Sequence, residues 1–140
     1  MKHTIIPELF RPAFIPLLVA NDPQATMAYE NAVCAFMRKF TDHYEGGHWE
    51  FIEFENGAKA MIFDHGAIVM CHNHDNYYEG GMSLRALSMA CNLMACSHLS
   101  FRTTGQTQDR LADNYHLLRE VIGLSELFKR EVSSISRIID

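Results

Sequence analysis

The spacing of apolar residues along the chain predicts four helices. Apolar positions recur every three or four residues in segments at about 21–40, 83–98, 109–122 and from Ser125 onward, the spacing of a helix that buries one face. Asn21-Asp22-Pro23 supplies a capping side chain followed by proline, which indicates a helix start. Ser83 is the expected cap of the second helix. Because this second helix is apolar around nearly its whole circumference, it is predicted to be a buried central helix.

A different pattern, between the first two predicted helices, indicates strands. Three short apolar runs lie at 49–54, 58–63 and 67–74, each bounded by turn residues. Asn56-Gly57, between the first two runs, is the strongest short signal for a hairpin turn. We therefore expect an antiparallel β-meander of three strands or slightly more, with the glycine-containing stretch 75–81 as a loop.

The segment 3–19 carries three prolines, which prevent a continuous helix. Its strongly apolar residues are Ile5, Ile6, Leu9, Phe10, Phe14 and Ile15. We expect an arm that packs over the body of the protein, and a docking segment for a partner is the alternative. The chain shows no repeat and no linker, so these elements predict a single α+β domain over residues 1–140.

Composition narrows the class of protein. The chain is 48% hydrophobic and 21% charged, as in an ordinary globular domain, and its formal net charge of −5 disfavours direct binding to nucleic acid. Its four cysteines form no CxxC pair, so we expect buried thiols in a reducing compartment. The sequence shows no signal peptide and no long apolar span, so a cytoplasmic location without membrane contact is expected.

Acidic residues concentrate in the predicted meander. Between residues 42 and 79 there are eight acidic residues and one basic residue, whereas the rest of the chain has nine and eleven. Such a face can attract a basic protein that handles DNA, although solubility alone would also explain it. The candidate partner-binding residues are Asp42, Glu45, Glu50, Glu53, Glu55 and Asp64.

The candidates for chemistry are few. His72 and His74 lie two apart on a predicted strand and project from the same face, so the pair could bind zinc if a third ligand came from elsewhere. A metal-dependent enzyme built on this pair is the alternative function. No nucleophile elbow or phosphate-binding loop is present, and we expect neither a catalytic residue nor a cofactor.

Four blocks follow one another along the chain. They are Ile6-Pro7-Glu8-Leu9-Phe10, then Tyr44 to Phe51 with the pattern Tyr-x-Gly-Gly-x-Trp-x-Phe, then Tyr115 to Arg119, then Ile138-Ile139-Asp140. In these blocks the chain resembles the antirestriction family typified by ArdB and KlcA. The residues that match the motifs of the second and third blocks and the hairpin turn are Tyr44, Gly46, Gly47, Trp49, Asn56, Gly57, Tyr115 and Arg119.

The chain also departs from the family pattern. Arg11 and Ala58 stand where glycines are expected, and residues 121–136 lack the usual His-Pro-Glu. The resemblance implies a protein of a plasmid, prophage or genomic island that relieves type I restriction of unmodified incoming DNA. It implies binding to the type I restriction complex or an associated host factor, and transfers no catalytic residue. Direct mimicry of DNA is a further alternative, which the mild net charge disfavours.

Overall fold

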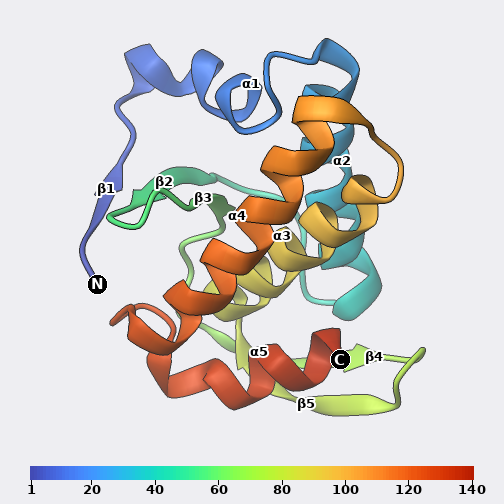
Figure 1. Cartoon of the computed structure of the whole chain (residues 1–140). Coiled ribbons are helices and arrows are strands. Elements are labelled where there is room, and N and C mark those ends of the chain that lie inside the picture. Colours follow the sequence, from blue (N-terminus) through green and yellow to red (C-terminus); the bar gives the residue numbers. More distant parts are fainter.

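Two small antiparallel sheets and five α-helices are seen in a computed structural model that describes all residues from 1 to 140 (Figure 1). In chain order the elements are β1 (His3–Ile5), the 3-10 helix η1 (Glu8–Ala13), α1 (Phe14–Leu18), α2 (Pro23–Phe40), β2 (Glu50–Phe54), β3 (Lys59–Ile62), β4 (Ile68–Asn73), β5 (Tyr78–Ser83), α3 (Leu84–Ser100), α4 (Gly105–Leu124), the 3-10 helix η2 (Lys129–Glu131) and α5 (Val132–Ile139). The predicted mixture of helices and antiparallel strands is confirmed.

The starts of helices α2 and α3 follow the capping signals in the sequence. The Asp22 carboxylate accepts a hydrogen bond from the Ala25 N–H at 3.1 Å, and the Ser83 hydroxyl accepts one from the Ala86 N–H at 3.0 Å. Each cap satisfies a backbone donor that the first helical turn leaves without a partner. The predicted starts of both helices are therefore confirmed.

The predicted meander is wrong in its third strand. The hairpin at Asn56-Gly57 is present, and β2 pairs with β3 in the register Glu53 to Lys59, with Gly57 at φ +92° in the turn. The next strand, β4, does not continue this sheet. It pairs with β5, while β1 from the N-terminal arm completes the first sheet in the order β1-β2-β3.

The outer edge of β3 explains this arrangement, because side chains of α3 and α4 occupy it. Asn92 accepts a hydrogen bond from the Met61 N–H at 3.0 Å and donates one to the Met61 carbonyl at 2.7 Å. Asn114 binds both backbone groups of Lys59 in the same way, each at 2.9 Å. The Ser88 hydroxyl accepts from the Phe63 N–H at 3.1 Å. No free edge remains for β4 to join.

The segment expected as a loop at 75–81 contributes most of strand β5. Its two adjacent glycines suggested a loop, but they serve a packing purpose instead. A Cβ on Gly80 would lie 2.8 Å from the Tyr78 hydroxyl oxygen, and one on Gly81 would lie 3.3 Å from Ile68 Cγ2. Glycine is used here where neighbouring side chains come close to a strand.

The C-terminal helices differ from prediction at their ends. α4 runs through Gly123, which was expected to end it, and stops one residue later at Leu124. Ser125 does not start the last helix, because it forms a turn in which its hydroxyl accepts from the Leu127 N–H at 3.2 Å. α5 begins only at Val132, after the 3-10 turn η2.

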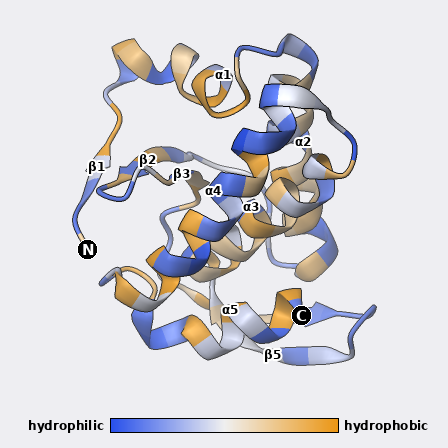
Figure 2. Ribbon diagram, in the orientation of Figure 1, coloured by the Kyte–Doolittle hydropathy of each residue, from blue (hydrophilic) through white to orange (hydrophobic).

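The core is one cluster of 36 buried apolar residues. Twelve of the 17 residues of α3 are buried, and this helix contacts α2, α4, α5 and β3. Hydrophilic and hydrophobic bands alternate along α4, which lies on the outside (Figure 2). None of the helices is both long and apolar enough to cross a membrane.

The N-terminal arm packs partly against the core at Ile6, but it fully buries side chains only in its second half. Phe14 and Ile15 are buried, whereas η1 buries no residue. The expectation that Leu9 and Phe10 pack inward is wrong, since 82% and 62% of their respective surfaces are exposed. The prolines turn the chain here, which leaves these two side chains outside the body of the protein.

We expect the replacement Asn92→Leu to lower the free energy of unfolding by about 3 kcal/mol or more, because it leaves both backbone groups of Met61 and the Tyr29 hydroxyl without their partner. Chemical denaturation followed by circular dichroism measures the change. Asn31→Leu, at an exposed position of α2, is the matched control and should change stability by less than about 0.5 kcal/mol. Equal midpoints for the two variants would contradict the role of Asn92.

Candidate partner-binding site

The Tyr44 to Phe51 block forms an aromatic cluster around Phe63. The Trp49 indole N–H donates to the Tyr44 hydroxyl at 3.1 Å, and both rings lie with their centroids 5.4 Å from that of Phe63. Burial raises the pKa of Tyr44, against the opposing effect of the Trp49 hydrogen bond. Trp49 itself is only half-buried, at the margin of the core. The block therefore shapes the surface loop between α2 and β2.

The two glycines of this block serve different purposes. Gly46 has φ +88° and Gly47 has φ +144°, conformations that side-chain-bearing residues rarely adopt. A Cβ on Gly46 would meet nothing within 4 Å, whereas one on Gly47 would lie 2.7 Å from Phe63 Cε2. Only Gly47 is therefore required by both the backbone conformation and the packing of the aromatic cluster.

Arg11 connects the first family block to the second. Its Nη2 donates to the Trp49 carbonyl at 2.7 Å, and its Nη1 lies 3.8 Å from Glu50 Oε2. The guanidinium also lies over the Phe51 ring, 4.4 Å from its centroid. The Phe51 ring in turn stacks against Phe14. The residue that departs from the family pattern thus anchors the exposed turn η1 to the loop before β2.

The remaining family residues connect the hairpin, α4 and the end of α5. The Asn56 amide donates to the Leu117 carbonyl at 3.1 Å, which holds the β2–β3 turn against α4. Tyr115 is half-buried, in the same helix. Arg119 Nη1 lies 3.9 Å from Asp140 Oδ1, so the third and fourth blocks meet in space.

Three of the six predicted partner-binding carboxylates are paired with cations. The pairs are Arg11–Glu50, Lys59–Glu53 and Arg85–Asp64. Two of these cations come from outside the segment 42–79, so the folded surface is less acidic than the local count of charges suggested. His48 Nε2 also lies 2.8 Å from Glu50.

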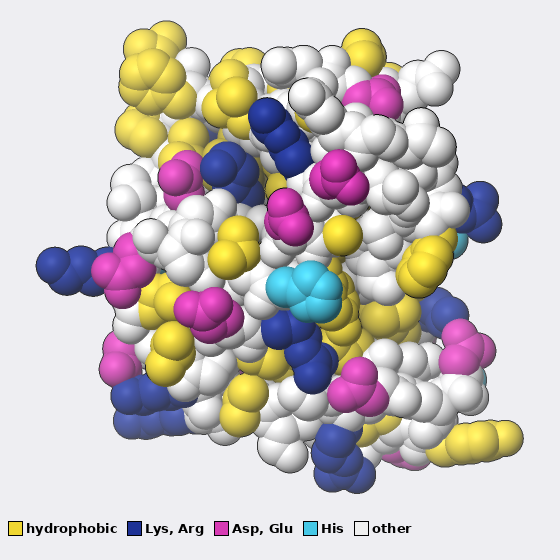
Figure 3. Space-filling model, viewed as in Figure 1, with side chains coloured by type: hydrophobic (Ala, Val, Ile, Leu, Met, Phe, Trp, Pro, Cys, Tyr) yellow, Lys and Arg dark blue, Asp and Glu magenta, His cyan; other side chains and the backbone are white.

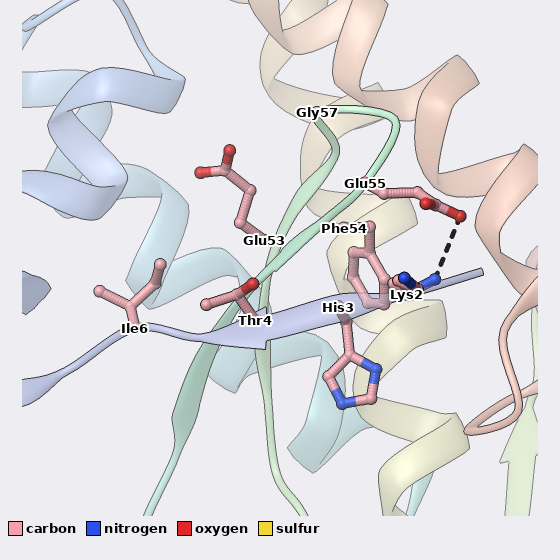
Figure 4. Close-up of a pocket in the computed structure, with 8 residues that line it drawn as sticks. All are labelled: Lys2, His3, Thr4, Ile6, Glu53, Phe54, Glu55 and Gly57. Atoms are coloured by element: carbon pink, nitrogen blue, oxygen red, sulfur yellow. Dashed lines mark hydrogen bonds between the residues drawn. The ribbon is translucent and has the colours of Figure 1, made fainter.

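The other three carboxylates remain more accessible. Glu55 accepts a hydrogen bond from the Lys2 backbone N–H at 3.1 Å, at the wall of a hollow of about 360 Å³ between β1 and the β2–β3 turn (Figure 4). Asp42 and Glu45 are exposed, and Asp42 lies 4.0 Å from His72 Nε2. Two of the six residues lie on β2, and the other four lie in the segment before it, in the β2–β3 turn and after β3. Their role in binding stays a prediction.

His72 lies on β4 and His74 lies in the turn directly after it, with the two side chains next to each other as their spacing predicts. Their rings stack with centroids 4.5 Å apart. Residues 1–140 contain no group of three or more histidine, cysteine, aspartate or glutamate side chains placed to hold a metal ion. The fold therefore brings no suitable third ligand to the pair.

Three of the four cysteines are buried, and all four are free. Burial raises the pKa of the Cys71 thiol to about 12 and that of Cys96 to about 11, and it raises the pKa of Cys91 well above its usual range. Since the thiolate is the nucleophilic form, these protonated thiols are poor nucleophiles at neutral pH. Cys34 is half-buried in α2.

The polar side chains that bind the edge of β3 differ in how visible they are in the sequence. Ser88 and Asn92 carry a usable signal, because they are two polar residues four apart in a mainly apolar helix. Asn114 gave no comparable signal in the polar helix α4. The role of Arg11 has no local signal, because its partners lie about 40 residues away in sequence.

These features define a small α+β protein whose turns and loops are held in place by specific side-chain contacts. A profile of the antirestriction protein family matches residues 42–140. The chain is 26% identical to the antirestriction protein KlcA of Escherichia coli over 117 residues, covering 83% of this chain and 81% of KlcA. It is 31% identical over 139 residues to YafX of E. coli K12, covering 98% and 86% of the two chains.

Comparison of the fold with solved structures leads to the same family. The solved structure of KlcA and ArdB superposes with a TM-score of 0.82 and 26% identity, covering 99% of this chain and 94% of the other. Those two proteins are described as having a novel fold and antirestriction activity against type I DNA restriction systems in vivo but not in vitro. This chain belongs to the antirestriction protein family, and the resemblance drawn from the four blocks is confirmed.

The two glycines allow a matched test of the aromatic cluster. We expect Gly46→Ala to lower the free energy of unfolding by about 1 kcal/mol, from backbone conformation alone. Gly47→Ala should cost about 2 kcal/mol more, because its methyl group must displace Phe63. Chemical denaturation followed by the fluorescence of Trp49, the single tryptophan, measures both. If the two variants are equally stable, Phe63 does not constrain this loop.

Thiol titration tests the burial of the cysteines. In the native protein at pH 8, an aromatic disulfide reagent should modify Cys34 first, and the other three thiols only as the protein opens. All four should react at once in denaturant. Cys34→Ser should remove the early phase and leave the later one intact. Early modification of Cys71, Cys91 or Cys96 would show that their surroundings are less closed than described.

Proposed function

We propose that this protein relieves host type I restriction of unmodified DNA that enters the cell, and that it is carried by a plasmid, prophage or genomic island. The observation that carries the proposal is the match to the structure of KlcA and ArdB over nearly the whole of both chains. The match includes the parts of the fold that hold the four blocks, rather than a common core alone.

The protein acts by binding, without catalysis of its own. Three features of the site support this part of the proposal. The buried thiols are protonated at neutral pH, the paired histidines have no suitable third ligand, and half of the candidate carboxylates are engaged by cations. The last feature also weighs against mimicry of DNA, which requires a dense array of uncompensated negative charge.

The partner is the type I restriction complex or a host factor associated with it, in the cytoplasm. For KlcA and ArdB, activity in vivo but not in vitro is consistent with a component that the cell supplies and a purified assay lacks. The net charge of −5 supports a protein partner over nucleic acid.

Plating of unmodified phage on a type I restricting host tests the function directly. Expression of this protein should raise the plating efficiency towards that of modified phage, because fewer phage genomes are cut. A host without the restriction system is the control, in which expression should change nothing. Equal plating on the restricting host with and without the protein would refute the proposal.

A further inference from the structure

The turn η1 presents two large apolar side chains that packing within the chain does not explain. Leu9 is 82% exposed and Phe10 is 62% exposed, and no residue of η1 is buried. Hydrophobic side chains gather at the upper left of the molecule, over the turns that follow β1 (Figure 3). Exposed apolar residues that adjoin one another and have polar neighbours are typical of interaction sites.

This turn is held in place before any partner arrives. Pro7 precedes it and Pro12 lies within it, so its backbone has little freedom to lose on binding. Arg11, next to Phe10, is fixed by its hydrogen bond to the Trp49 carbonyl and its stacking on Phe51. A pair of apolar side chains on a restrained backbone is an efficient anchor, because the backbone needs little ordering on binding.

The charges beside the turn select the kind of partner. Glu8 is exposed and forms no ion pair, whereas the charge of Arg11 is matched by Glu50. The unpaired negative charge of Glu8 disfavours phosphate groups of nucleic acids and anionic lipids. It also disfavours a second copy of this chain, since a twofold contact would bring the two Glu8 side chains towards each other.

We propose that Leu9 and Phe10 are the anchor by which this protein docks onto a partner protein whose surface has an apolar pocket rimmed by lysine or arginine. The inference rests on the proposed function, because the partner is a component of the restriction system or a host factor associated with it. It places the contact on η1, outside the six carboxylates that the sequence suggested.

The double variant Leu9→Ser, Phe10→Ser tests the anchor in the plating assay. Both side chains are mainly exposed, so the melting temperature should stay close to that of the wild type. Relief of restriction should fall by at least about tenfold, the effect of losing one or two anchor residues at an interface. Phe101→Ser is the matched control, because Phe101 is 85% exposed after α3, and it should retain full relief.

The rim is tested by reversal of charge. Glu8→Lys should reduce relief, whereas Glu30→Lys, at an exposed position of α2, should leave it unchanged. Full relief by Glu8→Lys would overturn the assignment of a basic rim to the partner. Sedimentation of the purified wild type should show a monomer. A dimer that the double variant converts to monomer would instead identify η1 as a contact between copies.

The outcomes separate the two proposals. If the wild type gives no relief in the restricting host, the proposed function fails. If the wild type relieves restriction and the folded double variant does so equally well, the function stands and the anchor on η1 is wrong.

Discussion

The fold depends on how the outer edge of β3 is satisfied. A buried strand edge must find partners for its backbone groups, and here Ser88, Asn92 and Asn114 supply them in place of another strand. Because Ser88 and Asn92 belong to α3 and Asn114 to α4, the same hydrogen bonds set the position of both helices against the first sheet. They also confine that sheet to three strands and oblige β4 and β5 to form a separate hairpin.

The surface is organised by contacts between distant parts of the sequence. Arg11 joins the N-terminal turn to the loop before β2, Asn56 joins the hairpin to α4, and Arg119 lies near Asp140. Each contact involves a family block or a residue next to one. The blocks therefore hold together elements that are distant in the sequence. η1 is different, because its apolar residues point outward.

The ion pairs show why a count of charged residues along the sequence does not predict the charge of the folded surface. The segment 42–79 is strongly acidic when counted by itself, yet Arg11 and Arg85 reach it from either side in sequence. Ion pairs at a surface add little stability, but they remove charge from the field that a partner would meet. The folded protein thus offers a weaker acidic surface and, on η1, a stronger apolar one than the sequence suggested.

The sequence by itself determined the features that depend on neighbours along the chain. The caps at Asp22 and Ser83, the hairpin at Asn56-Gly57, the inner face of α2 and the family blocks could all be predicted, because their signals lie within a few residues. Only the tertiary structure decided strand pairing, the exposure of Leu9 and Phe10, and the neutralisation of the carboxylates. Each of these depends on contacts between residues that are far apart in the sequence and come together only when the helices and sheets pack. A pattern within a few residues cannot predict such contacts.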